Sequence, residues 1–359
     1  MSDPFSRERL ASANPEAHAR RRLAAKPWFV SRFHRPIAAV TITSVPSILQ
    51  AESDMAYQVP RVQIVPRSDD QVSFQVDGQE RLRWHAAARY PRPCFFPLIG
   101  PSGRSLTRMG HPAAPDHGHH RSLWFGHVDI GGVNFWEERG GAQQIRQDAW
   151  VHYQDGPDQA GMVVRLGWYD SHNVRLMQQE LIAVYQPLPA GEGWLELQAT
   201  FTPVLDQLPL GKTNFGFLGL RVAASMSALY GGGKLTSSEG GVGEREIFAK
   251  SARWMDYSGP ITGDAWEGVT WFDHPSNPRH PSLWHVRDDG WMSPAFCLKE
   301  GYALQKSKPL RLRYGFLLHA RAVEQELADE KWRMFAKSAP LEVVPAERPW
   351  RVALRRAKG

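Results

Sequence analysis

The chain has 359 residues, of which 42% are hydrophobic, with a formal net charge of +6 and two cysteines. This length allows one large β-domain or two ordinary domains, and it is ample for a buried core. Part of the excess positive charge lies in the N-terminal segment, and the remainder is distributed thinly over the rest of the chain. No basic groove is therefore predicted, and nucleic acid is not expected as a partner. Cys94 and Cys297 do not make a disulfide framework, and we expect both to be reduced or buried.

The first 54 residues lack the alternation of a strand and hold an arginine-rich patch followed by a moderately apolar segment, 36–45. This leader is too long for a signal peptide and Pro46 interrupts its apolar part, so residues 1–54 are predicted to be a disordered N-terminal extension. We expect a soluble cytoplasmic protein, with a periplasmic or secreted location as the alternative. No run of roughly eighteen apolar residues is present, and no membrane span is predicted.

From Val59 onward the pattern is that of β-strands separated by turn residues such as Asp77-Gly78. The segments that alternate in this way are 61–65, 71–76, 82–84, 161–169, 174–181, 194–201 and 310–318. Within 310–318 the alternate apolar side chains share one face, which indicates one buried face. Regular strands of this kind predict an antiparallel β-sandwich, with residues 55–340 as a single domain.

The C-terminal part departs from the strand pattern. Residues 322–337 carry acids early and bases late, an order that suits a helix dipole, so a short C-terminal helix is predicted there. Residues 341–359 are rich in arginine and lysine toward the end and are predicted to be a basic C-terminal tail.

Histidine is concentrated in residues 111–127, where five of the fourteen histidines lie. In an extended chain, His117 and His119 would share one side and His120 would face away. Imidazoles are the usual acid/base groups near neutral pH and the commonest metal ligands. The cluster therefore predicts proton transfer or metal binding, and the alternative is a polar loop whose histidines cap backbone groups.

The same stretch resembles a known family. Residues 116–124 read Asp-His-Gly-His-His-Arg-Ser-Leu-Trp and resemble the Asp-His-Pro-His-His-Arg-Gly-Leu-Trp signature of the DUF6807 family, whose members are often labelled methane oxygenase PmoA. Further segments resemble the family at 96–103, 106–108, 219–223, 254–259, 272–277 and 284–290. The resemblance covers about residues 59–321, with Gly118 in place of a proline and Ser122 in place of a glycine. It implies an all-β fold, a large antiparallel β-sandwich similar to the supersandwiches of galactose mutarotases and polysaccharide lyases, and a carbohydrate-related setting.

A second polar group lies at 273–289, on a loop stiffened by proline and on the segment that follows it. His285 and Arg287 would share a strand face opposite Trp284, whereas the alternative for the whole group is a structural loop held by Asp–Arg pairs. Arg221 stands alone in an apolar strand as either a buried ion-pair partner or an anion clamp for a substrate. We predict that the two histidine groups meet in one pocket.

These patterns favour a carbohydrate-active enzyme of the epimerase, lyase or hydrolase type, acting on a sugar or sugar acid. The predicted acid/base groups are His117, His119 and His127, with Glu137 or Glu138 as the carboxylate partner. The predicted substrate-binding residues are His120, Arg121, Trp124, Asn134, Trp136, Arg221, Asp273, His274, Arg279, His285 and Arg287. Glycosidic hydrolysis usually needs two carboxylates, whereas epimerisation and β-elimination can run on histidine, so the latter two are favoured.

Two other functions are compatible with the same residues. The first is a metal-dependent enzyme, oxygenase-like as the family label implies. It would hold a divalent metal through His117 and His119 and a third ligand from His127, His274 or an acid. The second is a non-catalytic sugar-binding module that uses the aromatic side chains alone. In every case the expected partner is a small carbohydrate-like molecule, and the sequence indicates no oligomeric state.

Overall fold

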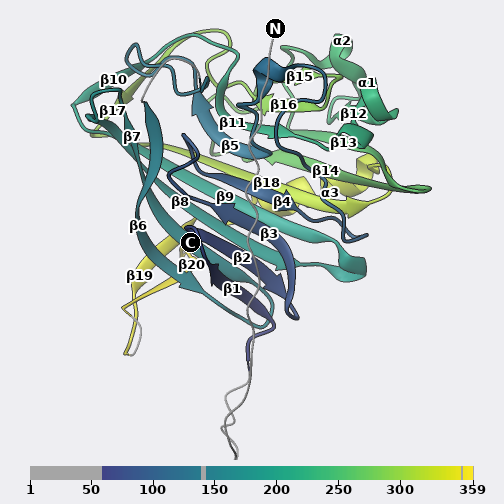
Figure 1. Ribbon diagram of the computed structural model, residues 1–359, viewed down its shortest axis with the longest axis horizontal. Coiled ribbons are helices and arrows are strands. Elements are labelled where there is room, and N and C mark those ends of the chain that lie inside the picture. The colour runs from purple at the N-terminus through teal and green to yellow at the C-terminus, as the bar shows by residue number, and fades with distance from the viewer. Residues whose placement is uncertain (1–58, 139–142, 349–350, 359) are drawn as a thin grey trace, which may run out of the picture. The chain divides into compact units, whose positions relative to one another are not determined.

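The computed structural model describes residues 59–138, 143–348 and 351–358, which build two large antiparallel β-sheets (Figure 1). The chain is all-β with a short C-terminal helix, as predicted. The predicted N-terminal extension, residues 1–54, lies outside the described residues. Within the described part of the chain, no helix is long and apolar enough to cross a membrane.

Each large sheet has eight strands, and each strand pairs with its neighbours in antiparallel fashion. Across sheet I the order is β1 (Val62–Arg67), β2 (Gln71–Val76), β3 (Gln79–His85), β4 (Cys94–Leu98), β5 (Leu123–His127), β11 (Gly216–Arg221), β16 (Trp291–Pro294) and β15 (Trp284–Arg287). Across sheet II the order is β12 (Lys234–Ser237), β13 (Trp254–Thr262), β14 (Ala265–Asp273), β18 (Leu310–Ala320), β9 (Gly193–Pro203), β8 (Arg175–Pro187), β7 (Ala160–Tyr169) and β6 (Gln144–Gln154).

Short elements connect or flank these sheets. They are the two-stranded sheet of β10 (Gln207–Leu210) and β17 (Tyr302–Gln305), the helices α1 (Ala228–Gly231), α2 (Gly243–Ile247) and α3 (Gln325–Ala336), and the 3₁₀ turns η2 (Pro115–His117), η3 (Pro189–Gly191) and η4 (Ala224–Met226). The helix predicted at 322–337 is therefore present as α3.

The main core lies between the sheets because alternate side chains of both point inward. The five predicted inward residues of β18 all belong to it: Leu310, Leu312, Tyr314, Phe316 and Leu318. Sheet I contributes Phe74, Leu82 and Leu123 to the same cluster. Each fully buried side chain of this size stabilises the fold by about 1.5–3 kcal/mol. Figure 1 shows β1–β3 of sheet I lying across β8 and β9 of sheet II.

The outer face of sheet II is covered by the C-terminal elements. Helix α3 packs Ala328 and Phe335 against Trp254, Phe272 and Leu317 of that face. This packing explains why the amphipathic segment forms a stable helix, since a short helix in water is marginal without a tertiary partner.

Residues 341–359 do not form the predicted tail. They contain the hairpin of β19 (Leu341–Pro345) and β20 (Val352–Arg356), which packs Leu341 and Leu354 onto Val163 and Ile182 of sheet II. Arg356 also pairs with a buried carboxylate of the sheet, Glu196. The terminal arginines and lysine dominate the composition of this segment, and its strands are too short for their alternation to stand out.

The outer face of sheet I is where polar groups gather. The strand register sets Trp124 of β5 opposite Gly219 of β11, and Arg221 of β11 opposite Trp291 of β16. A Cβ at Gly219 would lie 2.2 Å from the ring of Trp291, so glycine is needed there for this ring to lie across the neighbouring strand β11. This face carries the candidate site.

Candidate functional site

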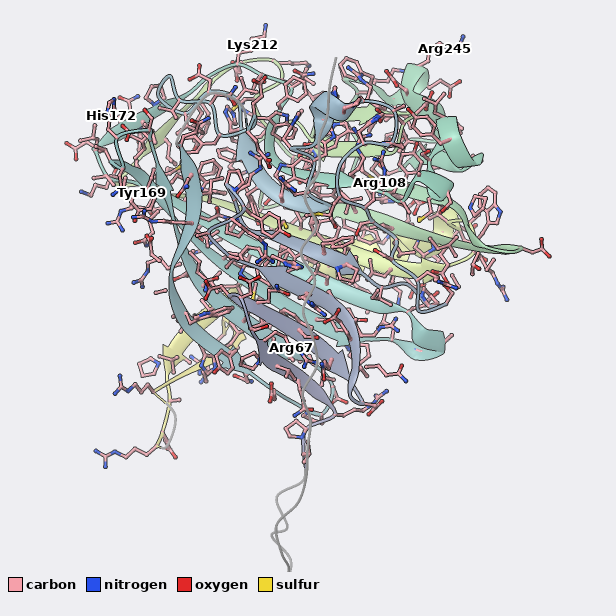
Figure 2. The ribbon with its side chains drawn as sticks, in the orientation of Figure 1. Arg67, Arg108, Tyr169, His172, Lys212 and Arg245 are labelled. Carbon is pink, nitrogen blue, oxygen red and sulfur yellow. The ribbon has the colours of Figure 1, made fainter. Side chains whose placement is uncertain are left out.

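A pocket of about 630 Å³ opens on the outer face of sheet I. Its walls come from the loop before β5, the segment 136–137, the loop 212–215, β11, and the hairpin of β15 and β16. Lys212, one of the lining residues, lies at the top of the view in Figure 2, whereas Arg67, at the end of β1, lies in the lower half. The first histidine group lines the pocket with His117, His119 and His120, and the second group lines it with His285 and Arg287. The two groups therefore meet in one pocket, as predicted.

The floor of the pocket is aromatic. Trp124, Trp136 and Trp291 contact one another, with ring centroids 5.3–5.5 Å apart. Cys94 belongs to the same cluster, and burial raises the pKa of its thiol to about 12. The thiol is thus protonated near neutral pH and is not a nucleophile here.

The histidine loop is folded into a turn. Pro115 begins the 3₁₀ turn η2, and the backbone N–H of His120 donates to the carbonyl of His117 at 3.1 Å. The rings of His117, His119 and His120 therefore contact one another, with centroids 4.5–5.6 Å apart. The prediction that His120 faces away was wrong because the segment is a turn, in which successive side chains do not alternate.

Charged side chains behind the loop hold it in place. Arg92, with 2% of its surface exposed, donates to the carbonyl oxygen of His119 at 2.8 Å. Arg121 pairs with Glu138 and lies 5.2 Å from the ring centre of Tyr90. Arg121 was predicted to bind substrate, but it does not line the pocket and instead supports the loop.

Asn134 has a similar supporting role. Its side-chain oxygen accepts the backbone N–H groups of Trp136 at 2.8 Å and Glu137 at 3.1 Å. This local turn aims Trp136 and Glu137 at the pocket, which both residues line. Asn134 and Trp124, predicted to contact substrate, do not line the pocket, and Trp124 packs against Trp136 and Trp291, which do.

A hydrogen-bonded chain runs from His120 through Arg221 to Asp289 and His111. The ring Nδ1 of His120 accepts from Arg221 Nε at 3.1 Å and Nη2 at 2.7 Å. Arg221 Nη1 donates to the carboxylate of Asp289, which also accepts from His111 Nε2 at 2.9 Å. Arg221 is therefore a buried ion-pair partner, the first of its two predicted roles, although it also lines the pocket.

This chain sets the charge of its members. Burial lowers the pKa of His120, and the charge of Arg221 lowers it further, so this ring is neutral. Burial acts to raise the pKa of Asp289, but the attraction of Arg221 and the hydrogen bond from His111 outweigh it and lower that pKa. The carboxylate therefore stays ionised beside the guanidinium.

His285 and Arg287 line the opposite wall from β15, on the face away from the buried Trp284, as the alternation predicted. The Nδ1–H of His285 donates to the carbonyl oxygen of Asn214 at 3.0 Å. Burial lowers the pKa of His285 to about 4, and the nearby Arg287 adds to the effect. Arg287 itself pairs with Glu244 at 3.1 Å.

The loop that precedes β15 does not reach the pocket. Asp273 is fully buried and accepts the side-chain N–H of Asn277 at 2.7 Å, while the Nη1–H of Arg313 donates to Nε2 of His274 at 2.8 Å. Arg279 donates to the carbonyl oxygen of Phe296 at 2.7 Å. The structural alternative holds for Asp273, His274 and Arg279, whose hydrogen bonds are used within the protein.

His127 is placed on the core side of β5, together with Leu123 and Phe125. Its ring is fully buried, lies 5.0 Å from the ring of Phe217, and accepts the backbone N–H of Asp129 at Nδ1. Burial lowers its pKa to about 4. The predicted acid/base role of His127 thus has no route to the pocket, because strand alternation turns the ring inward.

Several lining residues were not assigned from the sequence. They are Val128, Lys212, Thr213, Asn214, Phe215, Asp289 and Trp291. Asp289 and Trp291 flank a glycine turn just after His285 and Arg287, and that proximity was an available signal. The loop 212–215 carried none, since its place depends on the pairing of β11 with β5.

Among the described residues, no group of three or more histidine, cysteine, aspartate or glutamate side chains is placed to hold a metal ion.

The family model of DUF6807, described as a family of unknown function, matches residues 71–333 and so contains every residue that lines the pocket. The chain belongs to the DUF6807 family. This DUF6807 protein is also similar to a solved structure titled "Crystal Structure Analysis of HI1317", at 10% identity, over 71% of this chain and 98% of that chain, with a TM-score of 0.23. No curated protein matches the chain.

Proposed function

We propose that this DUF6807 protein is an enzyme that binds a sugar or sugar acid in the pocket and acts on it by proton transfer, as epimerases and lyases do. The observation that carries the proposal is a set of histidines, two of them neutral and fixed by hydrogen bonds, around an aromatic floor. A neutral imidazole can accept a proton at one ring nitrogen and donate a hydrogen bond from the other.

The floor and walls suit a carbohydrate. Trp136 and Trp291 line the pocket and offer apolar faces to the C–H side of a sugar ring, while its hydroxyls need the polar groups around them. A pocket of about 630 Å³ also lies in the usual range for small-molecule ligands.

The charges around the pocket favour an acidic sugar. Lys212 and Arg287 both line it, and Lys212 makes no ion pair among the described residues. A carboxylate on the substrate would find a partner there without displacing the pair of Arg221 and Asp289.

The carboxylates of the pocket argue for epimerase or lyase chemistry rather than hydrolysis. Among the described residues Glu137 and Asp289 line it, and Asp289 is held by Arg221 and His111. A glycosidase needs two carboxylates that flank the scissile bond, one as acid and one as base or nucleophile. Histidine with Glu137 meets the simpler needs of proton abstraction.

The test is a binding and turnover screen on the full chain. D-glucose, D-galactose, D-glucuronate and D-galacturonate, with their disaccharides, are titrated by calorimetry and then followed by NMR. We expect the uronates to bind more tightly than the neutral sugars and to be converted. Trp136→Ala should weaken binding by about fivefold, since an aromatic stacking contact is worth about 1 kcal/mol. Trp150→Ala, at a partly exposed tryptophan of β6, is the matched control.

The outcomes separate the candidate functions. Tight binding without conversion would contradict the enzyme and support a sugar-binding module. Conversion that is lost with a chelator and restored by a divalent metal would support the metal-dependent alternative. If none of these sugars binds, the proposal is wrong.

A further inference from the structure

Hydrogen bonding fixes the tautomer of His120. Arg221 has N–H groups only and cannot accept, so Nδ1 of His120 must accept from both Nε and Nη2. In a neutral imidazole the proton then sits on Nε2. His120 is thus a neutral ring whose Nε2–H is a donor.

The tautomer of His285 is the opposite. The carbonyl oxygen of Asn214 can only accept, so Nδ1 of His285 must carry the proton that it donates across 3.0 Å. Nε2 of His285 then holds a lone pair. His285 is thus a ring whose Nε2 is an acceptor and, with a suitable substrate, a base.

Both Nε2 atoms are open to the pocket. Within the described residues neither forms a hydrogen bond, and neither is among the buried polar atoms that lack a partner. Both rings line the pocket and both contact Trp291, with centroids 5.3 Å away for His120 and 5.8 Å away for His285. A ligand seated against Trp291 can therefore reach both a donor and an acceptor.

We infer that His285 is the base, and His120 the neutral hydrogen-bond donor, for removing a proton from a carbon next to a carbonyl group of a sugar-derived substrate. This inference rests on the proposed function and narrows it to uronates and keto-sugars. Such substrates offer both an acidic C–H bond for His285 and an oxygen on which His120 can stabilise negative charge.

The step balances without any further reagent. The C–H bond breaks and its proton passes to Nε2 of His285, while its electron pair forms a double bond to the carbonyl carbon. The π pair of the carbonyl moves onto its oxygen, which the Nε2–H of His120 then holds as an enolate. Return of a proton to the carbon restores the carbonyl compound, either unchanged or inverted.

The surroundings favour these roles. Burial keeps both rings neutral, so His120 donates a hydrogen bond without becoming charged, and His285 has its lone pair available. Arg287 shares the strand face of His285 and lines the same wall, where it can hold a substrate carboxylate. Arg221 is a positioning residue, since it acts on the substrate through the tautomer of His120.

The first test needs no substrate. Protein labelled with ¹⁵N in the histidine rings is examined by NMR at pH 7, and the signals are assigned with His120→Asn and His285→Asn. We expect both rings to be neutral, with the proton of His120 on Nε2 and that of His285 on Nδ1. The opposite tautomer or a charged ring at either position would overturn the inference.

The second test measures exchange in D₂O. The full chain is incubated with D-glucuronate, D-galacturonate and D-fructose, with D-sorbitol as a probe that lacks a carbonyl. We expect deuterium to enter one carbon-bound position of a carbonyl probe and none of D-sorbitol. His285→Gln should lower the exchange rate by at least about 100-fold while the probe still raises the melting temperature. His172→Gln, on the turn between β7 and β8 of sheet II (Figure 2), is the control that should exchange normally.

Different results would contradict the proposed function and the assignment of His285 as the base. Binding without exchange, or exchange that survives His285→Gln, overturns the assignment of His285 and leaves sugar binding intact. If no probe binds, the proposed function falls and the inference falls with it.

Discussion

Each sheet has a buried histidine near its outer face, and the pKa values of the two rings are shifted in opposite directions. His120 on sheet I and His319 on sheet II are both 5% exposed. The pKa of His120 is lowered by burial and by Arg221. Burial also acts to lower the pKa of His319, but the attraction and hydrogen bond of Asp256 outweigh it, and that pKa is raised. Because the exposure is equal, the hydrogen-bond partner decides the charge.

The difference also separates a site from a structural cluster. Asp256 accepts from His319 Nε2 at 2.9 Å, from Thr270 Oγ1 at 2.8 Å and from Ser258, so the polar groups around it satisfy one another. In the pocket, the hydrogen bonds run from His111 through Asp289 and Arg221 to His120. The Nε2–H donor of His120 is still available to a ligand. The groups around Asp256 hydrogen-bond to one another and stabilise the fold, whereas the donor of His120 can bind a ligand.

Lowering the pH should produce the largest effect on stability, and it tests whether the buried histidine rings are neutral. Five buried histidines have lowered pKa values: His85, His120, His127, His274 and His285. Each folded pKa lies below the unfolded value near 6.5, so each contribution to stability is present above pH 6.5 and is lost as the pH falls. We expect the free energy of unfolding to drop by up to about 1.4 kcal/mol per pH unit for each ring.

Denaturant unfolding between pH 7 and pH 4.5 measures this slope. The charged groups around His285 are Arg287, Arg221 and Asp289. The variant His285→Asn should reduce the slope of unfolding free energy against pH by the contribution of this one ring. His319 has the opposite sign: its pair with Asp256 is complete below pH 6.5 and is lost as the pH rises through the raised pKa. A slope of zero in acid would contradict the neutral assignment.

Removing the partner of His319 should have the next largest effect. Asp256→Asn leaves a buried ring without its counter-charge, and we expect a loss of about 3–5 kcal/mol in chemical unfolding. The control is Asp77→Asn, which breaks the exposed pair with Arg61 and should cost less than about 1 kcal/mol. Equal losses in the two variants would mean that the buried pair stabilises the fold no more than the exposed pair does.

A matched pair of glycine variants should give the smallest effects. A Cβ at Gly268 would lie 2.4 Å from the ring of His319, so Gly268→Ala should cost about 1–3 kcal/mol through overpacking. A Cβ at Gly118, in the histidine loop, would meet only a carbonyl oxygen at 3.7 Å, and φ is −57° there. Gly118→Ala should therefore gain about 0.4–1 kcal/mol. Thermal unfolding of both variants checks this contrast between a closed cluster and an open loop.

The sequence predicted the fold well because strand alternation is a local signal. The inward residues of β18 and the shared face of His285 and Arg287 followed from a period of two. Alternation also placed His127 with Leu123 and Phe125, which are core residues, so its burial was available from the same pattern.

The site was predicted less completely because its partners are distant in sequence. Nothing near His120 indicates that Arg221 will fix its tautomer, and nothing near Asp289 indicates that Arg221 will neutralise it. These contacts depend on the pairing of β5 with β11 and of β11 with β16. The turn at Pro115 was a local signal, and it was outweighed by the strand-like residues that follow it.

The position of β18 has a consequence for how the chain is made. This strand lies between β9 and β14 in sheet II, yet it is synthesised after both. On the ribosome, sheet II therefore stays split into two halves with bare edges until residue 320 has left the exit tunnel. A chaperone that binds unpaired strand edges would therefore have most time to bind sheet II before β18 is added. Nascent chains arrested before β18 should accordingly be cut by protease within β9 and β14, whereas chains arrested after it should resist.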